Sequence, residues 1–188
     1  MGNKIYPIGI QSFEKIRKDG YFYIDKTALV YQLAKTGCYY FLNRPRRFGK
    51  SLLISTLEAY FQGKQELFEG LAIDKLEKDW IKYPILHLDL NIGKYDAPES
   101  LNQILNDHLT HWEELYGSRP SEVSLALRFA GIIQRACEQT GQRTVILVDE
   151  YDKPMLQAIG NPELQENYRN ALKPVSYTHL RAHETELH

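Results

Sequence analysis

The chain has 188 residues, of which 43% are hydrophobic and 25% are charged, and its formal net charge is -1 at pH 7. This balance excludes a disordered chain, and the length suits one domain with a real core. A net charge near zero excludes a protein whose whole surface binds nucleic acid, although it allows a local basic patch. No apolar run is long enough to span a bilayer, and the first residues lack the apolar centre of a secretory signal. We therefore expect a cytoplasmic protein without a membrane partner.

The first half of the chain predicts a helix, a strand, a loop and a second helix, in that order. Residues 27–35 have a helical character, and the β-prone run Gly37–Asn43 follows them. After the loop the apolar residues recur on one helical face, and Gly63 is a suitable end for that helix. The residues on this face are Leu53, Leu57, Tyr60 and Phe61.

The second half predicts two more strands and three more helices. The apolar run Pro84–Asn91 predicts a strand, and Asp96 with Glu99 resembles the capping box of a long helix that ends near Gly117. Another helix follows, with Ser121 as its expected cap. Val145 to Val148 form a strand that is apolar throughout, as in a parallel sheet covered by helices. The last expected helix is capped by Asn161, starts at Pro162 and ends near Lys173.

The alternation of strands and helices predicts an α/β fold with a mainly parallel sheet flanked by helices. The last residues do not continue this pattern. Residues 174–188 lack apolar periodicity and resemble the translation of a sequencing adapter joined to a truncated gene. We therefore expect a truncated domain over residues 1–173, with residues 174–188 foreign to the natural protein. As natural sequence, His179 and His183 would have the i, i+4 spacing of a metal-binding pair on a helix.

The segment FLNRPRRFGKS, Phe41 to Ser51, ends like a phosphate-binding loop of the form G-x-x-x-x-G-K-[ST]. It lies between an expected strand and an expected helix, where backbone N–H groups and the positive end of the helix meet an anion. Lys50 would reach the β- and γ-phosphates of a nucleotide, Ser51 would take one Mg²⁺ position, and Gly49 would let the backbone close on the phosphates. However, Arg44 stands where the first glycine should be.

The start of this loop departs from the usual pattern in two ways. Arginine at a position with positive φ costs about 1 kcal/mol that glycine would not, and Pro45 removes one N–H group from the loop. Arg44, Arg46 and Arg47 also concentrate positive charge there. They could contact phosphates, a neighbouring subunit or nucleic acid, or they could form a solvated basic turn.

A second acidic motif follows the last strand, in the sequence VILVDEYD. Asp149 stands at the strand end, where a nucleotide site needs a carboxylate to hold Mg²⁺ through its water shell. Glu150 has the position of the base that orients the attacking water in many P-loop ATPases. An acidic turn after a buried strand is the alternative. Both motifs occur in the right order on the right elements, which favours a site for ATP and Mg²⁺. Asp89, on the other strand, could point into this site or face a loop.

Three stretches of the sequence resemble the AAA-ATPase-like family of bacterial P-loop proteins, which often carry a PD-(D/E)XK nuclease-like domain at the C-terminal end. The stretches are YFYIDKT (Tyr21–Thr27), FLNRPRRFGKSLLISTLEAYF (Phe41–Phe61) and VILVDEYDKP (Val145–Pro154). The loop form R-P-R-R-F-G-K-S is the family's usual variant. The resemblance implies a P-loop NTPase-like fold that is incomplete at its C-terminal end, because family members continue well past Lys173.

The resemblance also implies a role for individual residues. It implies Mg²⁺ coordination by Ser51 and Asp149 and catalytic roles for Lys50 and Glu150. The expected nucleotide-binding residues are Arg47, Phe48, Gly49, Lys50, Ser51 and Leu52. Asp25, Lys26 and Thr27 match the family's D-K-T, which lies near the nucleotide or its loop, and a helix cap at Asp25 is the equal alternative. Asp152 and Lys153 also match the family, without a role that we can derive.

The leading functional hypothesis is an ATP-binding, Mg²⁺-dependent ATPase module that couples its nucleotide state to an attached or partner domain. The alternative is a nucleotide-gated binding module, associated with nucleic acid through the arginine cluster, with little or no hydrolysis. A small-molecule kinase ranks last, because a kinase does not need a glutamate after the Mg²⁺ aspartate and the chain shows no arginine-bearing lid.

Overall fold

The computed structural model describes residues 5–37, 39–42 and 48–181, and for residues 174–181 it describes the backbone alone. The chain divides into two compact units, Met1–Ile85 and Leu86–His188.

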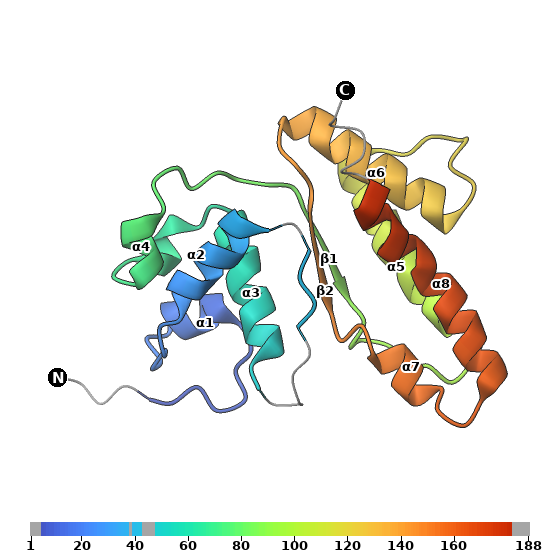
Figure 1. Cartoon of the computed structure of the whole chain (residues 1–188), viewed down its shortest axis with the longest axis horizontal. Coiled ribbons are helices and arrows are strands. Elements are labelled where there is room, and N and C mark those ends of the chain that lie inside the picture. The colour runs from blue at the N-terminus through green and yellow to red at the C-terminus, as the bar shows by residue number, and fades with distance from the viewer. Residues whose placement is uncertain (1–4, 38, 43–47, 182–188) are drawn as a thin grey trace. The chain divides into compact units, whose positions relative to one another are not determined.

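The described part of the first unit is built from helices (Figure 1). They are α1 (Phe13–Lys18), α2 (Thr27–Thr36), α3 (Lys50–Phe61), the short 3-10 helix η1 (Gln65–Phe68) and α4 (Ala72–Leu76). The two helices expected on either side of the loop are therefore confirmed. Aromatic rings pack together in their core: the ring centroids of Phe13 and Phe68 lie 4.8 Å apart, and Tyr60 meets the ring of Trp80 edge-on at 5.9 Å.

The strand expected at Gly37–Asn43 is wrong for the residues that the structure describes. Residues 39–42 form no strand, and Phe41 is 79% exposed. A strand needs a neighbour to accept and donate its backbone hydrogen bonds, and the two described strands pair with each other instead. Residues 38 and 43 lie outside the described residues.

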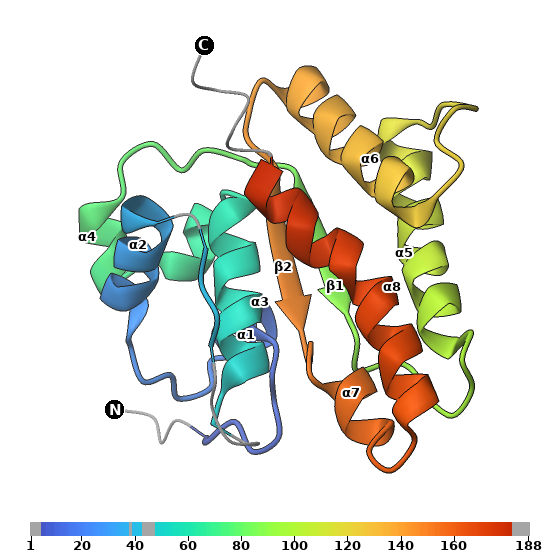
Figure 2. The same cartoon turned by 45° about the vertical axis from the view of Figure 1, so that its right-hand side comes forward.

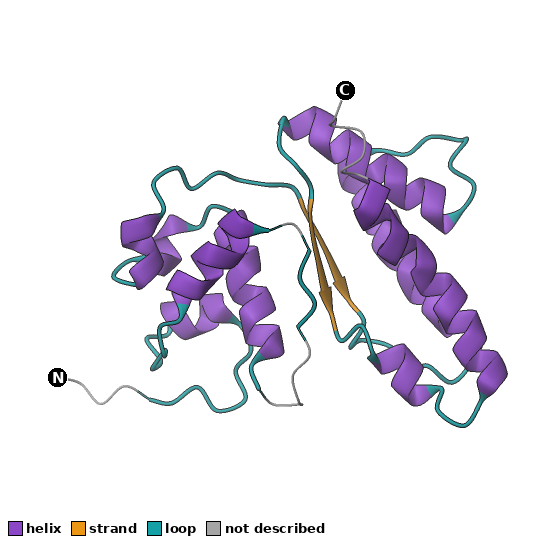
Figure 3. Cartoon of the chain, in the orientation of Figure 1, coloured by secondary structure: helices purple, strands orange, loops and turns teal. Residues whose placement is uncertain are grey.

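The second unit contains a two-stranded parallel sheet and four helices in its described part (Figures 2 and 3). In chain order they are β1 (Ile85–Asp89), α5 (Ser100–Tyr116), α6 (Leu125–Thr140), β2 (Val145–Asp149), α7 (Lys153–Gln157) and α8 (Pro162–Arg181). The two strands predicted for this half are confirmed: β1 is shorter than expected at both ends, and β2 extends one residue further, to Asp149. This small parallel sheet agrees with an α/β fold, while the P-loop NTPase class stays a prediction.

The longer helices of this unit, α5, α6 and α8, cover one face of the sheet (Figure 2). Leu86 and Leu88 of β1 are buried in the core that these helices form with the sheet, and Ile146 and Val148 of β2 pack against it. Because successive side chains of a strand point to opposite faces, Asp149 points to the other face of the sheet.

The helix starts show which side-chain caps the sequence indicated correctly. Asn161 caps α8 as expected, since its Oδ1 accepts the N–H of Leu164 at 3.1 Å. The other two expected caps are wrong. Ser124, not Ser121, caps α6 by accepting the N–H of Leu127 at 3.3 Å. Helix α5 begins at Ser100, with no side-chain cap, so the capping box at Asp96 does not form.

Helix α8 also runs further than expected. We expected it to end near Lys173, but its backbone stays helical to Arg181. Pro174 lies inside this helix and removes one backbone donor there, yet the helix continues past it, because extending a formed helix costs far less than starting one.

Candidate functional site

The start of α3 has the backbone geometry of an anion-binding helix end. Gly49 precedes the helix in the left-handed conformation, with φ 74° and ψ 25°, and its carbonyl oxygen accepts the N–H of Leu53 at 3.0 Å. No side chain caps this end, and the first turn holds no acidic residue. The N–H groups of Lys50, Ser51 and Leu52 have no acceptor inside the helix, and a helix start of this kind suits an anion at its positive end.

Glycine is required at position 49 by backbone conformation rather than by space. A Cβ atom built at Gly49 meets nothing within 4 Å, but the positive φ is one that side chains rarely adopt. Beside it Phe48 is 62% exposed, while Lys50 and Ser51 are half-buried. Arg47 and the earlier loop residues, 43 to 46, lie outside the described residues.

The second group of candidate residues lies at the carboxyl end of the sheet. Asp149 is the last residue of β2 and is only 9% exposed. Its Oδ1 accepts the N–H of Glu150 at 2.9 Å, and its carbonyl oxygen accepts the N–H of Leu90 from the end of β1 at 3.1 Å. This carboxylate is therefore held in place by its own turn at the edge of the sheet where ligands of parallel α/β proteins bind.

Glu150 has a strained backbone that the sequence did not indicate. Its φ is 53°, and it is one of two described residues other than glycine with a positive φ, the other being Trp80. For a residue with a Cβ atom this conformation costs on the order of 1–2 kcal/mol. Strain of this kind gathers at functional sites, where the surroundings hold a side chain in one direction.

Asn91 and Lys153 connect the ends of the two strands, a contact that sequence reasoning missed. The Lys153 ammonium group donates to the carbonyl oxygen of Asn91 and, at 3.1 Å, to its side-chain Oδ1. The N–H of Asn91 donates in turn to Oδ1 of Asp89 at 2.8 Å. The Asp89 carboxylate therefore shapes the loop after β1, one of its two expected roles. An asparagine in a turn is common, so nothing in the sequence indicated this contact.

Asp25 and Thr27 join the starts of two helices in the first unit. Oδ1 of Asp25 accepts the N–H and hydroxyl of Thr27, at 2.9 and 2.7 Å, and its Oδ2 accepts the N–H of Ala72, the first residue of α4, at 2.7 Å. The hydroxyl oxygen of Thr27 accepts the N–H of Ile73 at 3.1 Å. Burial raises the pKa of Asp25, but these hydrogen bonds outweigh it and hold the pKa below its usual value. Asp25 therefore binds the starts of both α2 and α4, but the cap position of α2 is Lys26, one residue after the expected cap, and a place for Asp25 near the nucleotide stays a prediction.

The donor types present suit magnesium held together with a nucleotide. Among residues 5–37, 39–42 and 48–181 no group of three or more His, Cys, Asp or Glu side chains could hold a metal alone. Mg²⁺ is usually held by one or two protein oxygens together with substrate phosphates and water. A serine at an anion-binding helix start and a buried aspartate at a strand end, Ser51 and Asp149, are residues of that kind.

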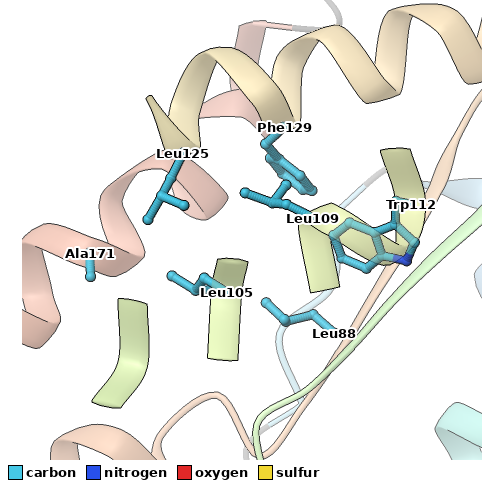
Figure 4. Close-up of a pocket in the computed structure, with 7 residues that line it drawn as sticks. All are labelled: Leu88, Leu105, Leu109, Trp112, Leu125, Phe129 and Ala171. Atoms are coloured by element: carbon cyan, nitrogen blue, oxygen red, sulfur yellow. The ribbon is translucent and has the colours of Figure 1, made fainter. Parts of the chain in front are cut away.

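An apolar cavity in the second unit is not a candidate for this site. It lies between β1, α5, α6 and α8 and measures about 20 Å³, room for one water molecule (Figure 4). Its walls are aliphatic and aromatic side chains that include Leu88, Leu109 and Trp112. A cavity without polar partners stays dry, so we regard it as a packing gap in the core.

The fold and these residues define an α/β protein with a glycine-led helix start and an acidic strand end. The model of the AAA-ATPase-like family, described as predicted AAA-ATPase, matches residues 7–187, and the chain belongs to that family. The resemblance of the sequence to this family is thereby confirmed. The match extends past residue 173, where the sequence analysis placed the end of the natural domain. That boundary, and the foreign origin of residues 174–188, stay predictions. No helix in the described part of the chain is long and apolar enough to cross a membrane.

The chain is also similar to an uncharacterized protein in the vnfD 5′ region of Azotobacter chroococcum mcd 1. The two are 40% identical over 175 residues, which are 92% of this chain and 34% of the relative. The chain therefore spans about a third of the relative's length. No solved structure matches the chain significantly.

Proposed function

We propose that the chain binds ATP with Mg²⁺ and hydrolyses it. One observation carries the proposal: Gly49, in the left-handed conformation, leads into an uncapped helix that begins with Lys50 and Ser51. Phosphate oxygens accept hydrogen bonds from such open N–H groups, and the helix dipole favours their negative charge. Membership of a family described as predicted AAA-ATPase supports the same assignment.

Each candidate residue has a separate role in this proposal. Lys50 contacts the β- and γ-phosphates, and Ser51 and Asp149 hold the metal, which neutralises charge on the phosphates when it is bound. Glu150 orients the attacking water and accepts its proton. Arg47, Phe48 and Leu52 line the nucleotide beside the loop.

Nucleotide binding is tested with Lys50→Ala and a matched control, Lys75→Ala, which removes an exposed lysine from the last turn of α4. Mg-ATP should raise the melting temperature of the wild-type chain. A charged hydrogen bond to phosphate is worth about 10-fold to 100-fold in affinity, so Lys50→Ala should lose that much in calorimetric titration. Equal affinities for the two variants would remove Lys50 from the proposed site.

Hydrolysis is tested with Glu150→Gln, which removes the base but keeps the size of the side chain. Phosphate release should slow by about 100-fold or more, while Mg-ATP affinity stays close to that of wild type. Glu163→Gln is the control, because Glu163 is an exposed acid in the first turn of α8. Unchanged turnover in Glu150→Gln would exclude it as the base.

The proposal includes an attached domain that responds to the nucleotide state, such as the nuclease-like domain that the family resemblance implies. The relative is about three times as long as the segment it shares with this chain, so it has room for such a domain.

The nucleic-acid alternative depends on Arg44, Arg46 and Arg47, which lie outside the described residues. A DNA affinity that does not fall as salt is raised would exclude phosphate contacts by these arginines.

A further inference from the structure

The strained turn at Glu150 needs something to hold it, because a side chain at φ 53° is less stable there than in an ordinary turn. Two hydrogen bonds hold the turn locally. The N–H of Glu150 donates to Oδ1 of Asp149 at 2.9 Å, and the carbonyl oxygen of Glu150 accepts the N–H of Lys153 at 3.0 Å. Both bonds lie within a short segment, and the bond from the N–H of Leu90 to the carbonyl oxygen of Asp149, at 3.1 Å, ties only the start of the turn to the neighbouring strand.

The side chain of Lys153 supplies a second connection, at the far end of the turn. Its ammonium group reaches the loop after β1 and binds both the carbonyl oxygen and Oδ1 of Asn91. That loop is itself fixed, because the N–H of Asn91 donates to Asp89 at the last position of β1. One lysine therefore closes the Glu150 turn with its backbone and anchors it to the neighbouring strand with its side chain.

We propose that Lys153 is a positioning residue: through its contact with Asn91 it holds the turn that fixes the direction of the Glu150 carboxylate. Its catalytic consequence rests on the proposed function, in which Glu150 orients the attacking water. A base must stand within hydrogen-bond reach of that water, and small displacements from the productive geometry slow reactions steeply. Lys153 itself does not need to touch the nucleotide.

The first test measures the turn itself and does not depend on activity. Lys153→Met keeps the aliphatic stem and removes the ammonium group, and Lys94→Met is the control, since Lys94 is an exposed lysine in the loop after β1. Amide hydrogen exchange at Glu150 and Lys153 should quicken by about 10-fold in Lys153→Met and stay unchanged in Lys94→Met. Exchange at Leu147, inside β2, should stay unchanged in both variants. Unaltered exchange at Glu150 and Lys153 would overturn the inference.

The second test measures turnover. Lys153→Met should lower kcat by about 10-fold and leave KM for Mg-ATP unchanged, and Lys153→Arg should recover part of the loss. If Lys153 acts through Glu150, the double variant Lys153→Met, Glu150→Gln turns over no more slowly than Glu150→Gln alone. A normal kcat in Lys153→Met, despite faster amide exchange, would overturn the catalytic part of the inference. A wild-type chain that hydrolyses no ATP, with the exchange result as expected, would overturn the proposed function and leave the structural role of Lys153 in place.

Discussion

Gly49 and Glu150 share a positive φ, but the conformation has a different consequence at each position. Gly49 adopts it without strain and thereby turns the chain into α3 with its first N–H groups open. Glu150 adopts it with a side chain that must be held against the strain. In the proposed function, Gly49 shapes the phosphate-binding helix start, and Glu150 presents its carboxylate to the attacking water.

Replacing Gly49 by alanine should separate conformation from binding. Gly20 is the matched control, because its φ is also positive, at 72°, and a Cβ atom there meets nothing within 4 Å. Each alanine variant should lower the free energy of unfolding by about 1 kcal/mol, measured in urea. Only Gly49→Ala should also weaken Mg-ATP binding in a calorimetric titration. Equal loss of nucleotide affinity in both variants would show that the effect is a general one on stability.

At the scale of elements, the first unit is held together by side chains that act on helix ends. Asp25 and Thr27 serve the starts of both α2 and α4. Glu77 follows α4 and accepts hydrogen bonds from Tyr60 of α3, from Lys35 of α2 and from the N–H groups of two neighbouring residues. Each carboxylate therefore accepts several donors at once, and for the buried Glu77 these hydrogen bonds offset the cost of burying its charge.

The hydrogen bonds of Asp25 at the two helix starts predict that its removal lowers stability. A role for Asp25 beside the nucleotide would instead predict that its removal weakens nucleotide binding. Asp25→Ala leaves the N–H of Ala72 and the hydroxyl of Thr27 without their acceptor, so we expect unfolding to become easier by about 1–2 kcal/mol. Mg-ATP affinity should not change. Asp19→Ala is the control, since Asp19 forms only an exposed i, i+4 pair with Lys15, and its removal should cost under about 0.5 kcal/mol. A selective loss of nucleotide binding in Asp25→Ala would place Asp25 near the nucleotide.

Glu77 predicts how the chain responds to acid. Burial raises the pKa of Glu77, but the hydrogen bonds from Tyr60 and Lys35 outweigh it and lower the pKa from 4.5 to about 2. The ionised form is therefore favoured in the folded state, so its stabilisation is full above about pH 4.5 and is lost as the pH falls toward about 2. Glu77→Gln should unfold about 2 kcal/mol more easily at pH 7, and the difference from wild type should shrink over this range. Urea unfolding at a series of pH values measures it.

Glu14 provides the control for this acid response. Hydrogen bonds from Lys18 and Lys64 also lower its pKa to about 2, but its side chain is 36% exposed, whereas that of Glu77 is 4% exposed. Added salt screens exposed charges much more than buried ones. The effect of Glu14→Gln should therefore fade at high salt, while that of Glu77→Gln should persist. Equal salt sensitivity in the two variants would contradict the assignment of Glu77 as a buried anchor.

At the scale of the whole molecule, patterns among neighbouring residues predicted single helices and strands better than they predicted contacts between segments that are distant in the sequence. Periodicity indicated the helices, and the apolar run before Asp149 indicated β2, because these patterns depend on near neighbours in the chain. Residues 39–42 have strand-forming side chains but no strand, since pairing depends on a distant segment. The sequence did not predict the contact between Lys153 and Asn91 for the same reason, because it joins positions 62 residues apart.

The proposed residue roles predict a distinctive pattern of hydrogen exchange. Because residues 48–52 and residues 149–153 are both proposed to contact the bound nucleotide, Mg-ATP should protect both segments from amide hydrogen exchange together. We expect Mg-ATP to slow exchange in each segment by about 10-fold or more, and both effects should disappear in Lys50→Ala. In Asp149→Asn the second segment should lose its protection and Mg²⁺ should no longer increase ATP affinity. Asp89→Asn keeps the oxygen that accepts the N–H of Asn91, so it should behave like wild type. Protection confined to residues 48–52 would show that Asp149 and Glu150 do not contact the nucleotide.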